Sequence, residues 1–110
     1  MMSVKNILNT SQHIFKELNE IIEQNNNGEF NYHISEIKYA IQLINNCIEN
    51  DYADSIDVIN ELKNIQQKIY PPRGGLSDFF IWKSDYEERI KANEPFEKLS
   101  DELWQLLQQD

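Results

Sequence analysis

The stretch "YHISEIKYAIQLINNCIEN", residues 32–50, decides the fold class of this 110-residue chain. From Phe30 onward, large apolar residues recur at alternating steps of four and three, at Ile34, Ile37, Ile41, Ile44 and Ile48. This spacing follows the 3.6-residue turn of an α-helix and not the two-residue period of a strand. Isoleucine is β-branched, but the period outweighs its intrinsic preference, so we expect an amphipathic helix from about Tyr32 to Asn50.

The segments on either side of this stretch have the same periodicity. They predict a first helix from Ser3 to Gln24, whose apolar stripe Ser11 interrupts, and a third helix from about Tyr52 to Ile69. The intervening "NNNGEF" stops the first helix, and Gly28 suits the left-handed conformation that often follows a helix end. The first 69 residues therefore predict three long helices.

A connector, "YPPRGGLSDFFIW", follows at residues 70–82. Pro71 disfavours helical geometry in the residue before it and should end the third helix, while Gly74 and Gly75 permit the positive φ of a chain reversal. The large apolar residues of the connector should mostly anchor it to the helices: Leu76, Phe79, Phe80 and Trp82. A second interpretation makes the connector a partner surface, with Tyr70, Arg73 and Asp78 as its polar members.

The last segment predicts a fourth helix with an interruption. Ser84 and Glu87 have the spacing of a capping box at its start. Pro95 should break or kink this helix at Glu94, with Asn93 as a new cap. The sequence thus predicts one all-α domain over residues 1–110, a bundle of three long helices plus a broken fourth helix after an ordered Pro/Gly connector.

The chain is acidic, with 19 Asp and Glu against 10 Lys and Arg and a formal net charge of −9. Such a charge disfavours binding to nucleic acid or to anionic membrane surfaces, and it favours a basic protein partner. Its alternative role is to keep the protein in solution. Cys47 is the only cysteine, and the start has neither a signal-peptide pattern nor a spanning apolar run, so we expect a cytoplasmic protein.

No catalytic or metal-binding motif stands out. His13 with Glu17 and His33 with Glu36 could each share a helix face, but we interpret both histidines as exposed polar residues. One enzymatic alternative pairs Glu17 and Glu20 with Asp54 and Asp57 as magnesium ligands, as in all-α nucleotide pyrophosphohydrolases. The Glu-x-x-Asp pair of those enzymes is absent, so we expect a non-enzymatic protein without metal or cofactor.

Five carboxylates gather where the second helix gives way to the third, at Glu49, Asp51, Asp54, Asp57 and Glu61. Asp54, Asp57 and Glu61 fall on one helical stripe that should face solvent. A solvated helix face explains this pattern without any function. The functional interpretation is an acidic patch for a cationic protein, with Tyr52 and Tyr70 as aromatic contacts.

The segment from Tyr70 to Leu107 resembles the C-terminal part of small bacterial proteins associated with toxin–immunity systems. The resemblance is carried by "YPPRGGLSDFFIW", then Arg89 and Asn93, then "ELWQLL". A short, acidic helical chain is also similar in format to the colicin-type nuclease immunity proteins. The resemblance implies a protein that binds a cognate toxin, most simply a nuclease, and covers its active or substrate-binding surface. A self-associating helical domain is a further alternative.

Overall fold

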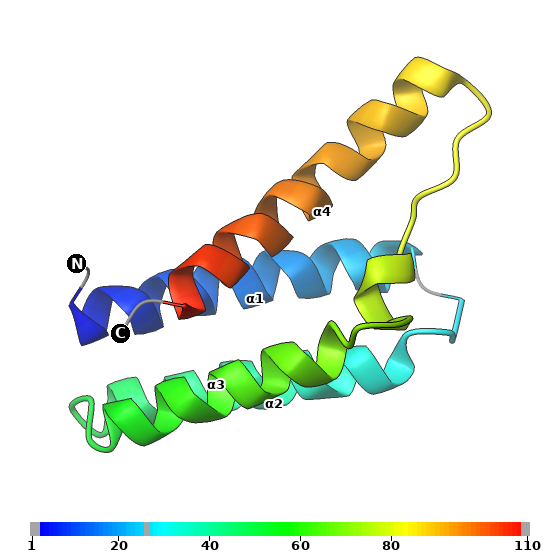
Figure 1. The fold of residues 1–110 in the computed structure, drawn as a ribbon. Helices are drawn as coiled ribbons and strands as arrows, with labels where there is room; N and C mark the ends of the chain where they lie inside the picture. Colours follow the sequence, from blue (N-terminus) through cyan, green and yellow to red (C-terminus); the bar gives the residue numbers. More distant parts are fainter. Residues whose placement is uncertain (1–2, 26, 109–110) are drawn as a thin grey trace.

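A computed structural model of the chain describes residues 3–25 and 27–108, and this part of the chain is all-α (Figure 1). Its α-helices are α1 (Val4–Asn25), α2 (Asn31–Glu49), α3 (Ser55–Ile69) and α4 (Tyr86–Leu107), and a 3-10 turn, η1 (Gly75–Asp78), lies between α3 and α4. No strand occurs among the described residues. The predicted helical class and the first three helices are confirmed, and α3 begins three residues later than predicted.

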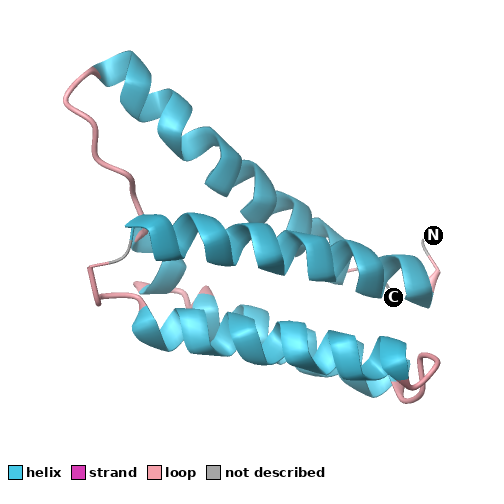
Figure 2. Cartoon of the chain, turned by 180° about the vertical axis from the view of Figure 1, so that it is seen from behind, coloured by secondary structure: helices cyan, strands magenta, loops and turns pink. Residues whose placement is uncertain are grey.

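The helices form an elongated bundle of 47 × 28 × 25 Å. Helices α2 and α3 lie side by side and α1 packs over them, as Figures 1 and 2 show from opposite sides. Helix α4 rests mainly on α1 and less on α3. Its C-terminal half follows α1, whereas its N-terminal half diverges from the bundle (Figure 1).

Apart from Ile56, which is 59% exposed, the core consists mostly of the apolar stripes that the sequence predicts. Its largest fully buried side chains are Leu8, Ile14, Phe15, Leu18, Ile22, Ile37, Ile44, Leu62, Ile65, Ile69, Leu76 and Leu103. Burial of one such side chain contributes roughly 1.5–3 kcal/mol, which makes these stripes the main source of stability. Ser11, which interrupts the stripe of α1, is fully buried with them.

Only half of the large apolar residues that were expected to anchor the connector are buried. Leu76 and Phe79 are buried, and the Phe79 ring packs 4.6 Å from the ring of Phe96, centroid to centroid. Phe80 and Trp82, in contrast, are 55% and 69% exposed. After Phe79 the chain has no helical assignment up to α4, and buried and exposed side chains alternate, because successive side chains of an extended segment point to opposite sides.

Helix α4 is continuous from Tyr86 to Leu107, so the predicted break at Pro95 is wrong. The helix begins one residue later than the capping box suggested, because the carboxylate of Asp85 and not Ser84 accepts the backbone N–H of Glu88, at 3.0 Å. Packing of the buried stripe after Pro95, which includes Phe96, Leu99 and Leu103, offsets the loss of one helical hydrogen bond.

Asn93 is not a helix cap but a buried clamp on the connector. Its Oδ1 accepts the backbone N–H of Ile81 at 2.8 Å, and its Nδ2 donates to the carbonyl of Ile81 at 3.0 Å. The same Nδ2 also donates to the carbonyl of Arg89 at 2.8 Å. These bonds, together with the bond from Arg89 Nε to the carbonyl of Lys83 at 2.9 Å, hold the extended segment against α4.

Candidate protein-binding site

The turn between α2 and α3 ends α2 in a Schellman motif. The backbone N–H of Tyr52 donates to the carbonyl of Cys47 at 2.7 Å, and that of Asp51 donates to the carbonyl of Ile48 at 3.1 Å. This pair of bonds requires a left-handed residue just after the helix, a position that glycine usually occupies. Here Asp51 occupies it with φ 57°.

Three of the four residues from Asp51 to Asp54 have positive φ, and none of them is glycine. The values are 57° for Asp51, 63° for Tyr52 and 57° for Asp54. A positive φ is tolerated by aspartate but is a genuine outlier for a bulky residue such as tyrosine. The turn therefore stores strain, which persists in proteins only where surrounding contacts determine it.

Contacts from α1 hold this strained turn in place. The Tyr52 hydroxyl accepts a hydrogen bond from Asn9 Nδ2 at 3.2 Å, and the Lys5 ammonium lies 5.0 Å from the centre of the Tyr52 ring. The thiol of Cys47 donates to the carbonyl of Ala53 at 3.3 Å. Burial raises the pKa of this thiol, and the nearby Asp54 carboxylate adds to the shift. Tyr52 thus positions the turn and is only partly exposed.

The structure places the five predicted carboxylates at and after this turn, and we call them the acidic surface: Glu49, Asp51, Asp54, Asp57 and Glu61. Glu61 is half-buried and the other four are exposed. Within residues 3–25 and 27–108, ion pairs within 4 Å join His13 to Glu17 and Lys38 to Glu23, and none involves the acidic surface. Its negative charge is therefore not neutralised by direct pairing with the described lysines and arginines.

The remaining predicted partner residues lie at the opposite end of α3. The 15 residues of this helix separate Asp54 from Tyr70 by about 24 Å along the axis. Tyr70 is mostly buried, and its hydroxyl shares a hydrogen bond with that of Ser100. Burial raises the pKa of Tyr70 to about 12. Arg73 and Asp78 are exposed on the connector that follows Tyr70, so the structure divides the predicted site into two groups.

The four carboxylates of the magnesium alternative are not brought together. Asp54 and Asp57 lie by the α2–α3 turn, which contacts α1 at Lys5 and Asn9. Glu17 is about 12 Å farther along α1 than Asn9, and it lines a groove beside α4 together with Glu20. No group of three or more His, Cys, Asp or Glu side chains in the described ranges is arranged to hold a metal ion.

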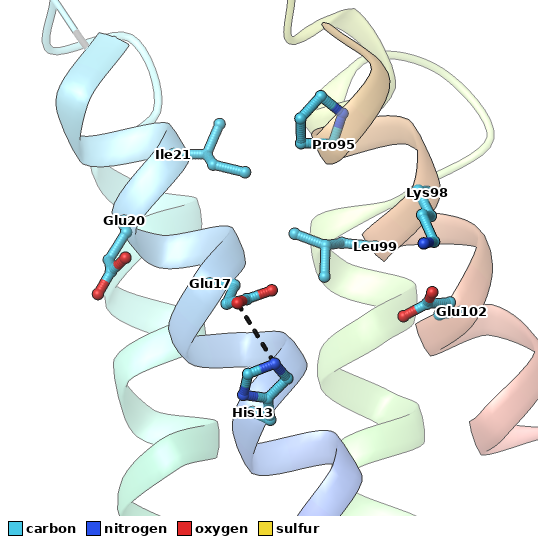
Figure 3. Close-up of a pocket in the computed structure, with 8 residues that line it drawn as sticks. All are labelled: His13, Glu17, Glu20, Ile21, Pro95, Lys98, Leu99 and Glu102. Atoms are coloured by element: carbon cyan, nitrogen blue, oxygen red, sulfur yellow. Dashed lines mark ion pairs between the residues drawn. The ribbon is translucent and has the colours of Figure 1, made fainter. Parts of the chain in front are cut away.

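The groove between α1 and α4 is a feature that the sequence did not indicate, and we call it the α1–α4 groove. It has a volume of about 480 Å³ and opens where α4 diverges from α1 (Figure 3). Its lining residues are His13, Glu17, Glu20, Ile21, Pro95, Lys98, Leu99 and Glu102. The sequence could suggest only the helical spacing of His13 and Glu17, whose Nε2 and Oε1 atoms lie 3.3 Å apart.

The two histidines differ in their surroundings. His13 is exposed, as predicted, whereas His33 is half-buried between the rings of Phe30 and Tyr32, with centroids 5.5 and 5.4 Å away. Burial lowers the pKa of His33, because the charged imidazolium loses hydration. The interpretation of His33 as an exposed residue is therefore wrong.

A group of exposed apolar side chains lies on the diverging part of α4 and on the connector before it: Phe80, Trp82, Tyr86 and Ile90. The guanidinium of Arg89 stacks on the Trp82 ring, with its Cζ 4.0 Å from the ring centre. The hydrogen bonds of Asn93 and Arg89 to the connector keep this group on one rigid element. Large exposed aromatics on a rigid support are typical of protein-contact surfaces.

Comparison of the chain with protein-family models, with curated proteins and with solved structures finds no match. None of the helices in the described ranges has an apolar stretch long enough to span a bilayer.

Proposed function

We propose that this protein is a non-enzymatic immunity protein, which binds a cognate basic bacterial toxin domain and blocks it. The toxin is most simply a nuclease, because an enzyme that acts on nucleic acid needs a cationic substrate surface. The inhibitor would bind stoichiometrically through the acidic surface and cover that cationic surface. The single observation that carries the proposal is the set of five clustered carboxylates without ion-pair partners among the described residues.

The electrostatics of the acidic surface suit rapid capture of a cation. Like charges on one helix face repel each other by a few tenths of a kcal/mol per pair, so the cluster is retained at a small cost in stability. A basic partner removes this repulsion and is steered towards the surface from solution.

The backbone of the α2–α3 turn supports the same interpretation. Positive φ at Asp51, Tyr52 and Asp54 costs of order 1 kcal/mol or more at each residue, and such strain is concentrated in proteins at binding and active sites. The Schellman motif and the bond between Tyr52 and Asn9 hold the turn in one shape before any partner arrives. A preorganised surface loses less conformational entropy on binding.

The proposal predicts that a gene adjacent to that of this chain encodes a basic secreted protein, and the test uses that protein. Cells that produce its toxic domain should survive only when they also produce this chain, and the two purified proteins should form a one-to-one complex. The substitutions Asp54→Lys and Asp57→Lys together should slow association about tenfold at low salt and weaken its salt dependence, as measured by stopped-flow fluorescence.

The matched control carries Glu87→Lys and Glu94→Lys, two exposed positions on α4 that change the net charge by the same amount. This control should retain most of the association rate, because steering depends on charges near the contact. Equal rates in both double variants would remove the acidic surface from the proposal. The immunity function itself is wrong if no neighbouring gene encodes a basic secreted protein, or if the chain fails to protect cells from it.

A further inference from the structure

The α1–α4 groove combines an apolar floor with an acidic margin. Ile21 of α1 faces Pro95 and Leu99 of α4 across the gap, as Figure 3 shows. Ile21 is half-buried and Pro95 is exposed, so part of this floor remains in contact with water. Burial of that apolar area by an incoming side chain would be favourable.

The charged residues of the groove are mostly carboxylates. Glu17, Glu20 and Glu102 line it, against the single lysine Lys98 and the exposed His13. Glu17 and Glu102 approach the gap from the two opposite helices (Figure 3). Apart from the contact of Glu17 with His13, no ion pair within 4 Å engages these three carboxylates among the described residues.

The shape of the groove selects among cationic occupants. Two diverging helices form an open channel, and an amphipathic helix commonly fills such a channel with the apolar residues of one face. The volume of about 480 Å³ is sufficient for a few large side chains of such a helix. Lysine and arginine beside these side chains can cover apolar surface with their stems and place their charges against carboxylates.

We propose that the α1–α4 groove binds a basic amphipathic helix of a protein partner. The apolar residues of that helix rest on Ile21, Pro95 and Leu99, and its lysines or arginines lie beside Glu17, Glu20 and Glu102. This site is separate from the acidic surface, because it uses residues of α1 and α4 only. It does not depend on the immunity function.

The test titrates the full-length, ¹⁵N-labelled chain with a synthetic helical peptide of about 18 residues, a length at which an isolated helix can form. The peptide has leucines at helical spacing on one face and lysines elsewhere, and its control replaces every lysine with glutamate. The lysine peptide should cause saturable amide shifts centred on Ile21 and Leu99, and the glutamate peptide should cause none.

Matched variants separate the groove from the general acidity of the chain. Glu17→Lys with Glu102→Lys should weaken binding of the lysine peptide about tenfold or more, because two attractions become repulsions. Glu49→Lys with Glu61→Lys makes the same change in net charge at the acidic surface and should weaken it less than about threefold. Thermal melts of both variants check that the fold is retained.

Three outcomes overturn the inference. The first is the absence of saturable shifts around Ile21 and Leu99 with the lysine peptide. The second is a set of shifts centred on the α2–α3 turn, which would show that the peptide binds the acidic surface and not the groove and would leave the proposed function intact. The third is concentration-dependent self-association that the groove substitutions abolish, because a second copy of the chain would then be the occupant.

Discussion

The connector requires glycine at position 75, because a larger residue there would clash with its neighbours. The φ of Gly75 is 64°, and an added Cβ would lie 2.7 Å from the carbonyl oxygen of Ile69 and 2.5 Å from Cδ of Pro71. Both neighbours belong to the end of α3 and the rigid ring that follows it, so neither can move cheaply. Because Gly75 has no Cβ, the chain can pass this close to α3, reverse its direction and place Leu76 in the core.

We expect Gly75→Ala to destabilise the protein by about 2–4 kcal/mol, because steric overlap adds to the cost of a positive φ. The free energy of unfolding from urea titrations followed by circular dichroism measures this. Gly28→Ala is the matched control, since Gly28 also has positive φ, 100°, but an added Cβ there meets no atom within 4 Å. Similar losses in the two variants would contradict the steric explanation.

Tyr70 should make stability depend on pH in the alkaline range. Burial raises its pKa to about 12 from an ordinary value near 10, so the unfolded chain releases this proton at lower pH than the folded chain. The folded state therefore loses stability as pH rises from about 10 to 12, by up to about 3 kcal/mol. Urea titrations across this range should show a smaller loss for Tyr70→Phe, which has no proton to release. Parallel losses in both proteins would assign the effect to other groups.

At the scale of single residues, the sequence predicted conformations that follow from local sterics. Positive φ at Gly28, Gly74 and Gly75 is confirmed, because only the absent Cβ had to be known. The positive φ of Tyr52 was not predictable, because the contacts that hold it come from Asn9 and Lys5, which are distant in sequence. The alternation of Phe79, Phe80 and Trp82 was missed because the segment was not recognised as extended.

Helix α4 shows how packing can overrule a local breaking signal. Pro95 removes the backbone N–H that would bond to the carbonyl of Lys91, and its ring crowds the preceding turn. The helix continues because the buried residues on both sides of Pro95, including Asn93, Phe96 and Leu99, fix its direction. The sequence rule describes the proline correctly but contains no information about those tertiary contacts.

Pro95→Ala should therefore stabilise the protein, by about 1–3 kcal/mol, because it restores one hydrogen bond and removes the steric crowding in a helix that already exists. Chemical denaturation gives the change in unfolding free energy. Lys91→Ala, on an exposed face of the same helix, controls for the general effect of alanine. Destabilisation by Pro95→Ala would show that the proline stabilises the diverging half of α4 in a way that the hydrogen-bond argument omits.

For the elements as a whole, periodicity was the reliable signal. The helices α1, α2 and α3 were predicted with small errors at their ends, and the largest error is the start of α3. That error follows from the left-handed residues at 51, 52 and 54, which the apolar pattern cannot reveal. The start of α4 differs from the prediction by one residue. Ser84 and Asp85 are both acceptable caps by residue type, and in the structure Asp85 is the cap.

At the scale of the molecule, the features proposed or considered for partner binding lie on separate parts of the bundle. The acidic surface flanks the α2–α3 turn, the exposed aromatics are on the connector and the diverging half of α4, and the groove lies between α1 and α4. The acidic surface was predictable because its carboxylates are neighbours in sequence. The groove was not, since it joins residues around 17 and 99 through a crossing angle that only the assembled core determines.

Helix α1 begins, and α4 ends, on the same side of the bundle as the α2–α3 turn (Figure 1). A fluorescent protein, an affinity tag or a surface anchor fused at Val4 or Leu107 would therefore crowd the acidic surface and could mask a partner that binds there. Attachment through a cysteine introduced at Tyr86, on the far tip of α4, leaves that side open to solution. A capture experiment should therefore attach the protein at the end of the bundle that lies away from the acidic surface.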